Sequence, residues 1–121
     1  MDISVITVTW NSADIIDEQI SSVKNGCKNI TCEQIIVDNA SSDDTVKIIE
    51  KYLGAQNIAS LQLIQNDKNM GFGHPNNQAA KFAKGEFLLF LNPDMRVAEG
   101  SLDVMVDWMR QHADVGVASC K

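Results

Sequence analysis

Short apolar runs rich in β-branched residues alternate along the chain with longer segments in which apolar residues recur every three or four positions. The short runs are typical of buried strands, whereas the longer period places apolar side chains on one face of a helix. The predicted strands are residues 4–9, 34–38, 61–65, 87–91 and 115–118. The predicted helices carry Ile16, Ile20 and Val23; Val46, Ile49 and Leu53; and Leu102, Met105, Val106 and Met109. A further helix is expected from Pro75 to about Lys84, because the residue before a proline disfavours the helical conformation. The alternation predicts an α/β fold, a mostly parallel sheet with helices on both faces.

A polar, acidic or glycine-rich segment follows each of the first four predicted strands. These segments are residues 9–11, 38–41, 66–73 and 92–94. In parallel α/β sheets, ligands bind beyond the carboxyl ends of the strands, near the point where strand order reverses. The pattern therefore predicts one binding site built from these four segments.

Length and charge restrict the class of ligand. A chain of 121 residues has room for one domain, and 45% apolar with 21% charged residues is ordinary for a globular protein. The formal net charge of -6 argues against a nucleic-acid partner, because phosphate backbones require clustered Lys and Arg. Free nucleotides remain compatible, since a metal ion and backbone N–H groups can meet their phosphates.

The chain shows no signal for export or membrane insertion. Its first residues lack a basic region followed by a long apolar run. The longest apolar stretch, residues 87–91, is far short of the ~20 residues that a membrane span needs. Three cysteines without CxxC spacing and only two histidines favour reduced thiols over a zinc site. We therefore expect a cytoplasmic protein with no membrane span.

Asp38 ends the second predicted strand and has two interpretations. At a strand end its carboxylate can accept a hydrogen bond from a ligand N–H, such as the imide of uracil or thymine. It can equally be a turn acid that caps the backbone N–H groups of Ser41 or Ser42. The position alone does not separate them.

Asp94 follows the most apolar strand, in Asn92-Pro93-Asp94. A single carboxylate there can bind Mg²⁺ or Mn²⁺ when a diphosphate and water supply the other oxygens. A solvated β-turn with proline at its second position is the alternative, and position alone favours the turn.

The two glycines of residues 69–73 precede a predicted helix, so the backbone there can approach a ligand closely. A dinucleotide-binding fingerprint would need a third glycine where Asn76 stands, and it would follow the first strand rather than the third. A phosphoacceptor receiver domain would need acids where Thr9-Trp10-Asn11 stands. Both alternatives are therefore weak, and neither histidine lies in a recognisable nucleophile motif.

Four segments carry a resemblance to a known family: residues 5–11, residues 37–45, residues 69–73 with Asn77, and residues 87–94. Together, in this order and spacing, they resemble the family 2 glycosyltransferases of the GT-A type, especially the bacterial branch that includes rhamnosyltransferases. The resemblance spans nearly the whole chain. It implies the Rossmann-like, nucleotide-binding half of that fold.

The resemblance also implies roles for individual residues. The nucleotide-binding residues would be Thr9, Trp10, Asn11, Asp38, Asn39, Asn69, Gly71 and Asn92. Asp38 would bond the pyrimidine imide, and the segment around Gly71 would pass close to the base and ribose. Asp94 matches the final acid of a DxD-like motif and would hold Mg²⁺ or Mn²⁺ on the donor diphosphate.

The activity implied is inverting transfer of a sugar from a UDP- or dTDP-linked donor to a hydroxyl of a saccharide or lipid-linked saccharide, as in cell-surface polysaccharide synthesis. A carboxylate general base would assist the acceptor hydroxyl. In a longer chain the domain could also lie peripherally on the inner membrane face.

Length sets a limit on this interpretation. Catalytic domains of the family continue into an acceptor half, so residues 1–121 are expected to be the donor part, cut before that half. The general base is expected beyond Lys121, and this chain alone is expected to transfer little or no sugar. The alternative is a non-catalytic nucleotide-binding or interaction module, against which the intact Asp38 and Asp94 count. An unpaired sheet edge is also an association surface that would permit a homo-oligomer.

Overall fold

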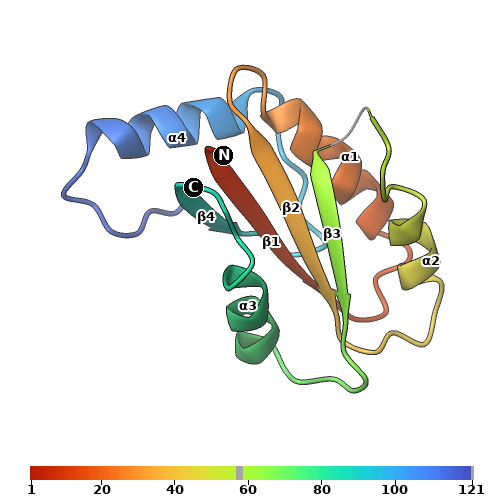
Figure 1. Ribbon diagram of the computed structural model, residues 1–121. Helices are drawn as coiled ribbons and strands as arrows, with labels where there is room; N and C mark the ends of the chain where they lie inside the picture. Colours follow the sequence, from red (N-terminus) through yellow and green to blue (C-terminus); the bar gives the residue numbers. More distant parts are fainter. Residues whose placement is uncertain (57–58, 121) are drawn as a thin grey trace.

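The structure is a computed structural model, and it describes residues 1–56 and 59–120. Strands and helices alternate along the chain (Figure 1). The elements are β1 (Ile3–Thr9), α1 (Ile16–Gly26), β2 (Cys32–Asp38), α2 (Thr45–Glu50), β3 (Ser60–Gln65), α3 (Gly73–Ala80), β4 (Phe87–Phe90) and α4 (Ser101–Gln111). None of the helices in the described part of the chain has the length and apolar character needed to cross a membrane.

The four strands form one parallel sheet in the order β3-β2-β1-β4. The chain moves outward from β1 to β2 to β3 and then returns through α3 to place β4 on the other side of β1 (Figure 1). Strand order therefore reverses between β1 and β4. In register, Thr9 pairs with Asp38, and Asp38 pairs with Gln65, so three carboxyl ends reach the same level. The predicted parallel sheet is confirmed.

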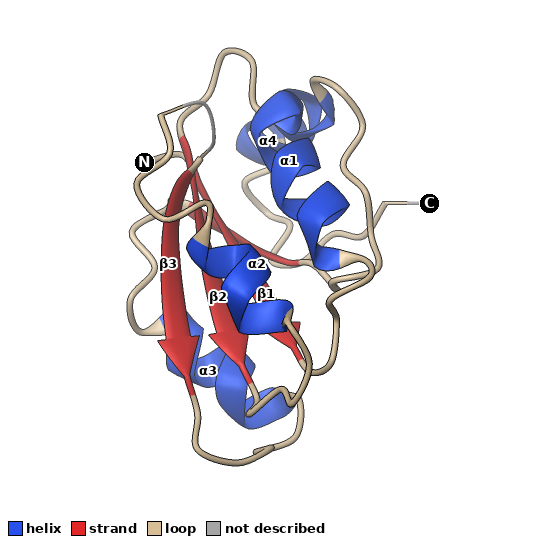
Figure 2. Ribbon diagram, turned by 90° about the vertical axis from the view of Figure 1, so that its right-hand side faces the viewer, coloured by secondary structure: helices blue, strands red, loops and turns tan. Residues whose placement is uncertain are grey.

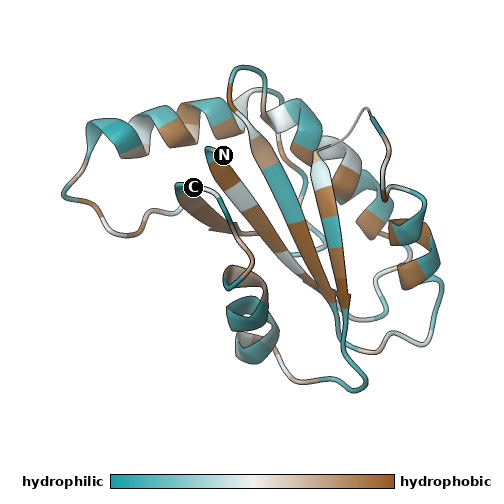
Figure 3. Ribbon diagram, in the orientation of Figure 1, coloured by the Kyte–Doolittle hydropathy of each residue, from teal (hydrophilic) through white to brown (hydrophobic). Residues whose placement is uncertain are grey.

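Helices cover both faces of the sheet, as predicted. On one face α1 and α2 pack Ile16, Ile20 and Ile49 against Ile36 of β2. On the same face α4 adds its buried side chains to a cluster with β1 and α1, comprising Ile3, Val5, Val23, Cys27, Leu102 and Val106. The opposite face carries α3, whose Ala79 packs on Ile6, Ile35 and Val37 (Figures 1 and 2). Figure 3 shows brown, apolar stretches on the strands and teal, polar residues in the loop beyond β3.

Two predicted elements are wrong in detail. Residues 115–118 form no strand, and Val117 is 90% exposed. A run of only four residues interrupted by Gly116 has little apolar surface to bury against the sheet, which explains this difference. The third helix begins at Gly73 rather than Pro75 and ends at Ala80 rather than near Lys84. Proline is tolerated in a first turn, where its missing N–H needs no partner, so the helix can begin two residues earlier.

A polar cluster ties the amino end of the sheet to α4. Asp2 accepts hydrogen bonds from the backbone N–H of Thr31 at 2.7 Å and from its hydroxyl at 2.7 Å. The guanidinium of Arg110 lies against Asp2 and Glu86. The Thr31 N–H and then the Arg110 hydrogen bond hold the pKa of Asp2 well below its ordinary value of 3.8. The charged form of Asp2 is therefore favoured in the folded state.

We expect this depressed pKa to make the fold sensitive to acid. Since the folded pKa lies below the unfolded value, the stabilisation is complete above about pH 4 and is lost as pH falls further. Melting temperatures from pH 7 to pH 2.5 should fall more steeply in the native chain than in Asp2→Asn. The variant should be the less stable of the two at pH 7. Parallel curves for the two proteins would contradict this role of Asp2.

Candidate functional site

The site predicted from the sequence lies at the carboxyl edge of the sheet, where the loops after β1, β2 and β3 meet (Figure 2). Backbone hydrogen bonds extend the sheet pairing one step into these loops. The N–H of Asn39 donates to the Thr9 carbonyl at 2.8 Å, and the N–H of Asn66 donates to the Asp38 carbonyl at 2.9 Å. The beginnings of the loops are therefore as well fixed as the strands.

Asp38 is buried at this edge and has most of its acceptor positions filled. Its Oδ1 accepts hydrogen bonds from the hydroxyls of Thr9 at 2.8 Å and Ser41 at 2.6 Å. Its Oδ2 accepts from the Ser41 N–H at 2.9 Å. The turn-capping interpretation thus describes the observed contacts. A carboxylate has about four acceptor positions, and the described residues fill three of them, which leaves one on Oδ2.

Thr9 is fully buried, and its hydroxyl is donated to Asp38. Its side chain therefore holds the carboxylate in place rather than lining an open pocket. Ser41 does the same from the other side, and its hydroxyl also accepts the N–H of Asn11 at 2.9 Å. Sequence analysis assigned Ser41 no role beyond a turn partner. The hydrogen bond between Asn11 and Ser41 is evident only in the folded structure, which brings the loops after β1 and β2 together.

Asn39 connects β2 to the glycine segment. Its Nδ2 donates to the Gly71 carbonyl at 2.7 Å, while its Oδ1 accepts the Met70 N–H at 3.3 Å. Asn69 closes the turn by accepting the Gly71 N–H at 2.9 Å. Gly71 has φ +79°, a conformation that glycine adopts without a steric penalty. These contacts fix the path of the segment that is expected to pass close to a ligand.

Trp10 and Asn11 lie in the loop after β1, at the carboxyl edge of the sheet. Trp10 is 56% exposed, which is unusual for so large an apolar side chain. Asn11 has φ +47°, and its Oδ1 accepts the Ser42 N–H at 2.8 Å. Phe72, which the sequence analysis did not single out, is 61% exposed beside the glycine turn. Two aromatic faces are thus available at this edge for a planar ligand.

Asn92 and Asp94 follow β4, on the other side of β1 from Asp38. Both residues are exposed. Among the described residues, the Asp94 carboxylate has no hydrogen-bond or ion-pair partner. Hard divalent cations prefer such oxygen ligands and accept diphosphate oxygens and water for the rest. Asp94 therefore fits the role of a single protein ligand to Mg²⁺ or Mn²⁺.

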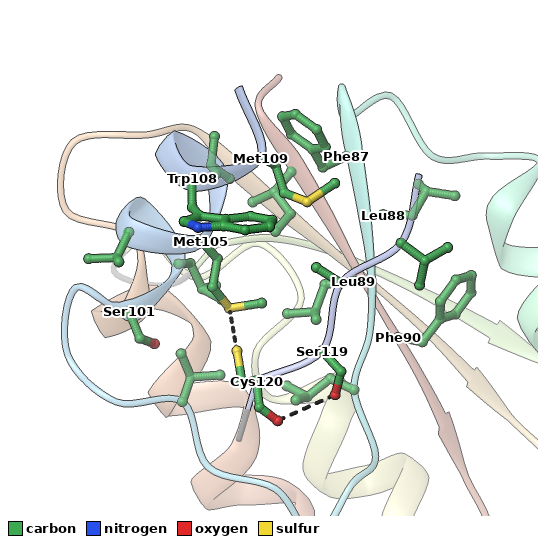
Figure 4. Close-up of a pocket in the computed structure, with 18 of the residues that line it drawn as sticks. Phe87, Leu88, Leu89, Phe90, Ser101, Met105, Trp108, Met109, Ser119 and Cys120 are labelled. Carbon is green, nitrogen blue, oxygen red and sulfur yellow. Dashed lines mark hydrogen bonds between the residues drawn. The ribbon is translucent and has the colours of Figure 1, made fainter. Parts of the chain in front are cut away.

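The described residues form no metal cage and no deep polar pocket that would be an alternative to the site at the carboxyl edge. Across residues 1–56 and 59–120, no group of three or more His, Cys, Asp or Glu side chains could hold a metal. A cavity of about 1250 Å³ lies between β4, α4 and residues 116–120 (Figure 4). Its walls are mostly apolar, with Leu89, Met105 and Trp108 among them. Its few polar lining residues include Arg96, Ser101 and Ser119, and most of its surface is apolar.

The fold and the sequence place this protein among the glycosyltransferases. Residues 4–120 match the family described as Glycosyl transferase family 2, and the chain belongs to that family. It is 35% identical over 113 residues to the poly(ribitol-phosphate) beta-N-acetylglucosaminyltransferase TarS of Staphylococcus aureus, covering 93% of this chain and 19% of TarS. It is 33% identical to a poly(ribitol-phosphate) beta-glucosyltransferase of Bacillus spizizenii, covering 84% of this chain and 16% of that protein.

Solved structures agree with the fold. The crystal structure of Staphylococcus aureus TarS 1-349 in complex with UDP superposes with a TM-score of 0.82 at 35% identity, covering 93% of this chain and 33% of that one. A mannosyltransferase from Pyrobaculum calidifontis, in complex with GDP-Man and Mn²⁺, has a TM-score of 0.81 at 24% identity, a likeness of fold alone. The predicted GT-A fold is thus confirmed. The rhamnosyltransferase-like branch is not confirmed by these relatives.

The chain spans about one fifth of the length of the TarS relative from Staphylococcus aureus. The family match over residues 4–120 takes in all four helices and the parallel sheet of the described chain.

Proposed function

We propose that this chain binds the nucleoside diphosphate of a pyrimidine nucleotide-sugar, with UDP as the favoured nucleotide, and that a divalent cation on Asp94 holds the diphosphate. One observation carries the proposal. A buried carboxylate with an acceptor position to spare and an exposed carboxylate without a partner among the described residues lie on opposite sides of β1. The strand order reverses at this point, where α/β sheets bind ligands.

The nucleoside end is assigned to the loops after β1, β2 and β3. Asp38 accepts the imide N–H of the pyrimidine through Oδ2, while Thr9 and Ser41 hold its carboxylate. The exposed Trp10 offers an aromatic face to the base. Asn39 and Asn69 keep the turn at Gly71 in place, so that its backbone passes the base and ribose. The UDP and UDP-GlcNAc complexes of TarS, at 34–35% identity, support a uridine nucleotide.

The diphosphate end is assigned to the loop after β4. The Asp94 carboxylate would hold Mg²⁺ or Mn²⁺, and Asn92 would bond the ribose or a metal-bound water. A divalent cation at this position neutralises the charge that develops on the departing nucleoside diphosphate. A DxD-like motif reduced to one acid is sufficient if diphosphate oxygens and water complete the ligand set.

The reaction we propose for the whole protein is inverting transfer of the sugar to a hydroxyl of a cell-surface polysaccharide. The names of two relatives, both poly(ribitol-phosphate) glycosyltransferases, support a polymeric acceptor. Inversion requires a general base opposite the leaving group, and no residue of this chain is assigned to that role.

The test is calorimetric titration of UDP, dTDP and GDP into the 121-residue chain, with and without Mn²⁺. We expect UDP to bind more tightly with Mn²⁺ than without it. We expect GDP to bind more weakly than either pyrimidine nucleotide, since the buried Asp38 carboxylate leaves less room for the two-ring guanine than for a single pyrimidine ring. Equal affinities for GDP and UDP would overturn the pyrimidine assignment. Absence of binding by all three nucleotides at saturating Mn²⁺ would instead favour a non-catalytic interaction module on the same fold.

A further inference from the structure

Helix α1 runs along the segment that carries Asp94 and contacts it repeatedly. Its contacting residues share one helix face and lie at positions 18, 19, 22 and 25. Four contacts join this face to the segment: Glu18 with Arg96 at 2.8 Å, Gln19 with the Asn92 carbonyl at 3.5 Å, Ser22 with the Val97 N–H at 3.0 Å, and the Asn25 carbonyl with the Gly100 N–H at 3.0 Å. Hydrogen bonds and one ion pair therefore connect residues 92–100 to α1 at four points.

The Ser22 contact is the best defined of these. Its hydroxyl is buried, donates to the Gln19 carbonyl at 2.8 Å and accepts the Val97 N–H. Val97 is itself buried in the apolar cluster beneath α4. Gly26 allows this close approach, because a Cβ at that position would lie only 2.3 Å from Val97 Cγ1. The chain just after Asp94 is thus pressed against the helix.

Gln19 contacts the loop on the amino-terminal side of Asp94, at the Asn92 carbonyl. Its side chain is 1% exposed and oriented by two short hydrogen bonds, from Nε2 to the Thr7 hydroxyl at 2.7 Å and from Gln34 Nε2 to its Oε1 at 2.7 Å. A hydrogen of Nε2 remains directed at the Asn92 carbonyl, a long contact at 3.5 Å. This amide joins β1, β2 and α1 to the start of the loop. Asp94 lies two residues after Asn92 and three before Val97, between the two attachments.

We infer that α1 positions the loop backbone that carries Asp94, with Ser22 and Gln19 as positioning residues for the metal and diphosphate. The inference rests on the proposed function. Partners that hydrogen-bond a metal ligand typically contribute about 10- to 100-fold to metal affinity, and residues that hold the loop backbone instead are expected at the low end of that range. A loop with both ends attached keeps its backbone in place before the cation arrives, so less ordering is needed on binding.

The test measures Mn²⁺ affinity at saturating UDP, from the electron paramagnetic resonance signal of free Mn²⁺, in Ser22→Ala. We expect the apparent Kd for Mn²⁺ to rise about tenfold. The affinity for UDP in metal-free buffer should stay within about twofold of the native value, because the nucleoside contacts lie on β1, β2 and β3. The matched control is Ser21→Ala, whose hydroxyl points outward to Tyr52 and the Asp17 carbonyl, and its Mn²⁺ affinity should be native.

A second variant covers the case in which Ser22→Ala fails to fold. Glu18→Gln removes only the exposed ion pair with Arg96, so the fold should be retained, and the Kd for Mn²⁺ should rise about threefold. An unchanged Kd for Mn²⁺ in Glu18→Gln, with Ser22→Ala unfolded, would also overturn the positioning role. Native Mn²⁺ affinity in folded Ser22→Ala, or an equal loss of metal-free UDP affinity, would overturn the positioning role and leave the proposed function intact. If Mn²⁺ did not change the UDP affinity of the native chain, both the positioning role and the proposed function would be overturned.

Discussion

Replacing Asp94 by asparagine is expected to abolish the Mn²⁺-dependent part of UDP binding. The substitution keeps the size of the side chain and removes its charge, and Asp94 has no partner among the described residues whose loss would disturb the fold. Since loss of a residue behind a metal ligand costs about 10- to 100-fold, loss of the ligand itself should raise the Kd for Mn²⁺ by at least about 100-fold. Calorimetry with UDP, with and without Mn²⁺, measures this change.

The metal-free titration provides the sharper discrimination. Without a cation, a carboxylate beside a diphosphate repels it, so Asp94→Asn should bind UDP as well as the native chain or better. The variant should therefore lose affinity in Mn²⁺ and retain or gain it in chelator. Asp107→Asn, an exposed acid on α4, is the matched control and should behave as native in both buffers. If Asp94 were only a turn residue, Mn²⁺ dependence would survive the substitution.

Much of the fold could be predicted from the sequence because it depends on local periodicity. The runs in β1 and β2 are short and rich in β-branched residues, as buried strands are, and both strands were predicted within two residues of their observed ends. The same principle failed at residues 115–118, where the run was short and pairs with no strand in the structure. An apolar run is a strand only when a neighbour completes its hydrogen bonds.

The candidate site was predictable in position and less so in function. Polar residues at strand ends meet at one edge in any parallel sheet, which is why residues around Asp38 and Asp94 were expected to form a site. The sequence pattern alone does not show to which oxygen atom a side-chain hydroxyl donates its hydrogen bond. The engagement of Asp38 by Thr9 and Ser41 therefore appears only in the folded structure.

The support beneath the site was not predicted for the same reason. Gln19 and Ser22 lie on a helix with an ordinary amphipathic pattern, in which a buried glutamine or serine gives no local signal. Their partners, Asn92 and Val97, are more than 70 residues away in sequence. Long-range polar contacts of this kind depend on how α1 packs against the chain after β4, which periodicity does not specify.

Gly85→Ala should be the most damaging single methyl group that can be added to this chain at a glycine. Gly85 leads into β4, and a Cβ there would lie 2.4 Å from the Ser4 nitrogen, 2.7 Å from the Ile3 carbonyl carbon and 2.8 Å from the Phe87 carbonyl oxygen. All three are backbone atoms, so no side-chain rotation can relieve the overlap. The methyl group must push the start of β4 away from β1, the central strand that it pairs with.

That displacement also disrupts buried polar contacts. The Gly85 N–H donates to the Ser4 hydroxyl at 2.8 Å, and Ser4 in turn donates to the buried Glu33 carboxylate at 2.6 Å. Glu33 also accepts the Lys84 N–H at 2.7 Å. Steric overlap and weaker hydrogen bonds to the buried Glu33 carboxylate together should lower the free energy of unfolding by about 3 kcal/mol or more. A loss of this size lowers the melting temperature by roughly 10 °C or more.

Thermal unfolding followed by circular dichroism measures this loss, and Gly116→Ala serves as its control. A Cβ on Gly116 would meet nothing within 4 Å, so that variant should melt within about 2 °C of the native chain. Because β4 leads directly into the loop of Asp94, folded Gly85→Ala should also bind Mn²⁺ more weakly at saturating UDP than the control does. A Gly85→Ala chain as stable as Gly116→Ala would mean that β4 can separate from β1 at little cost. In that event the register of β4 on β1 could not be what holds the Asp94 loop at the carboxyl edge of the sheet.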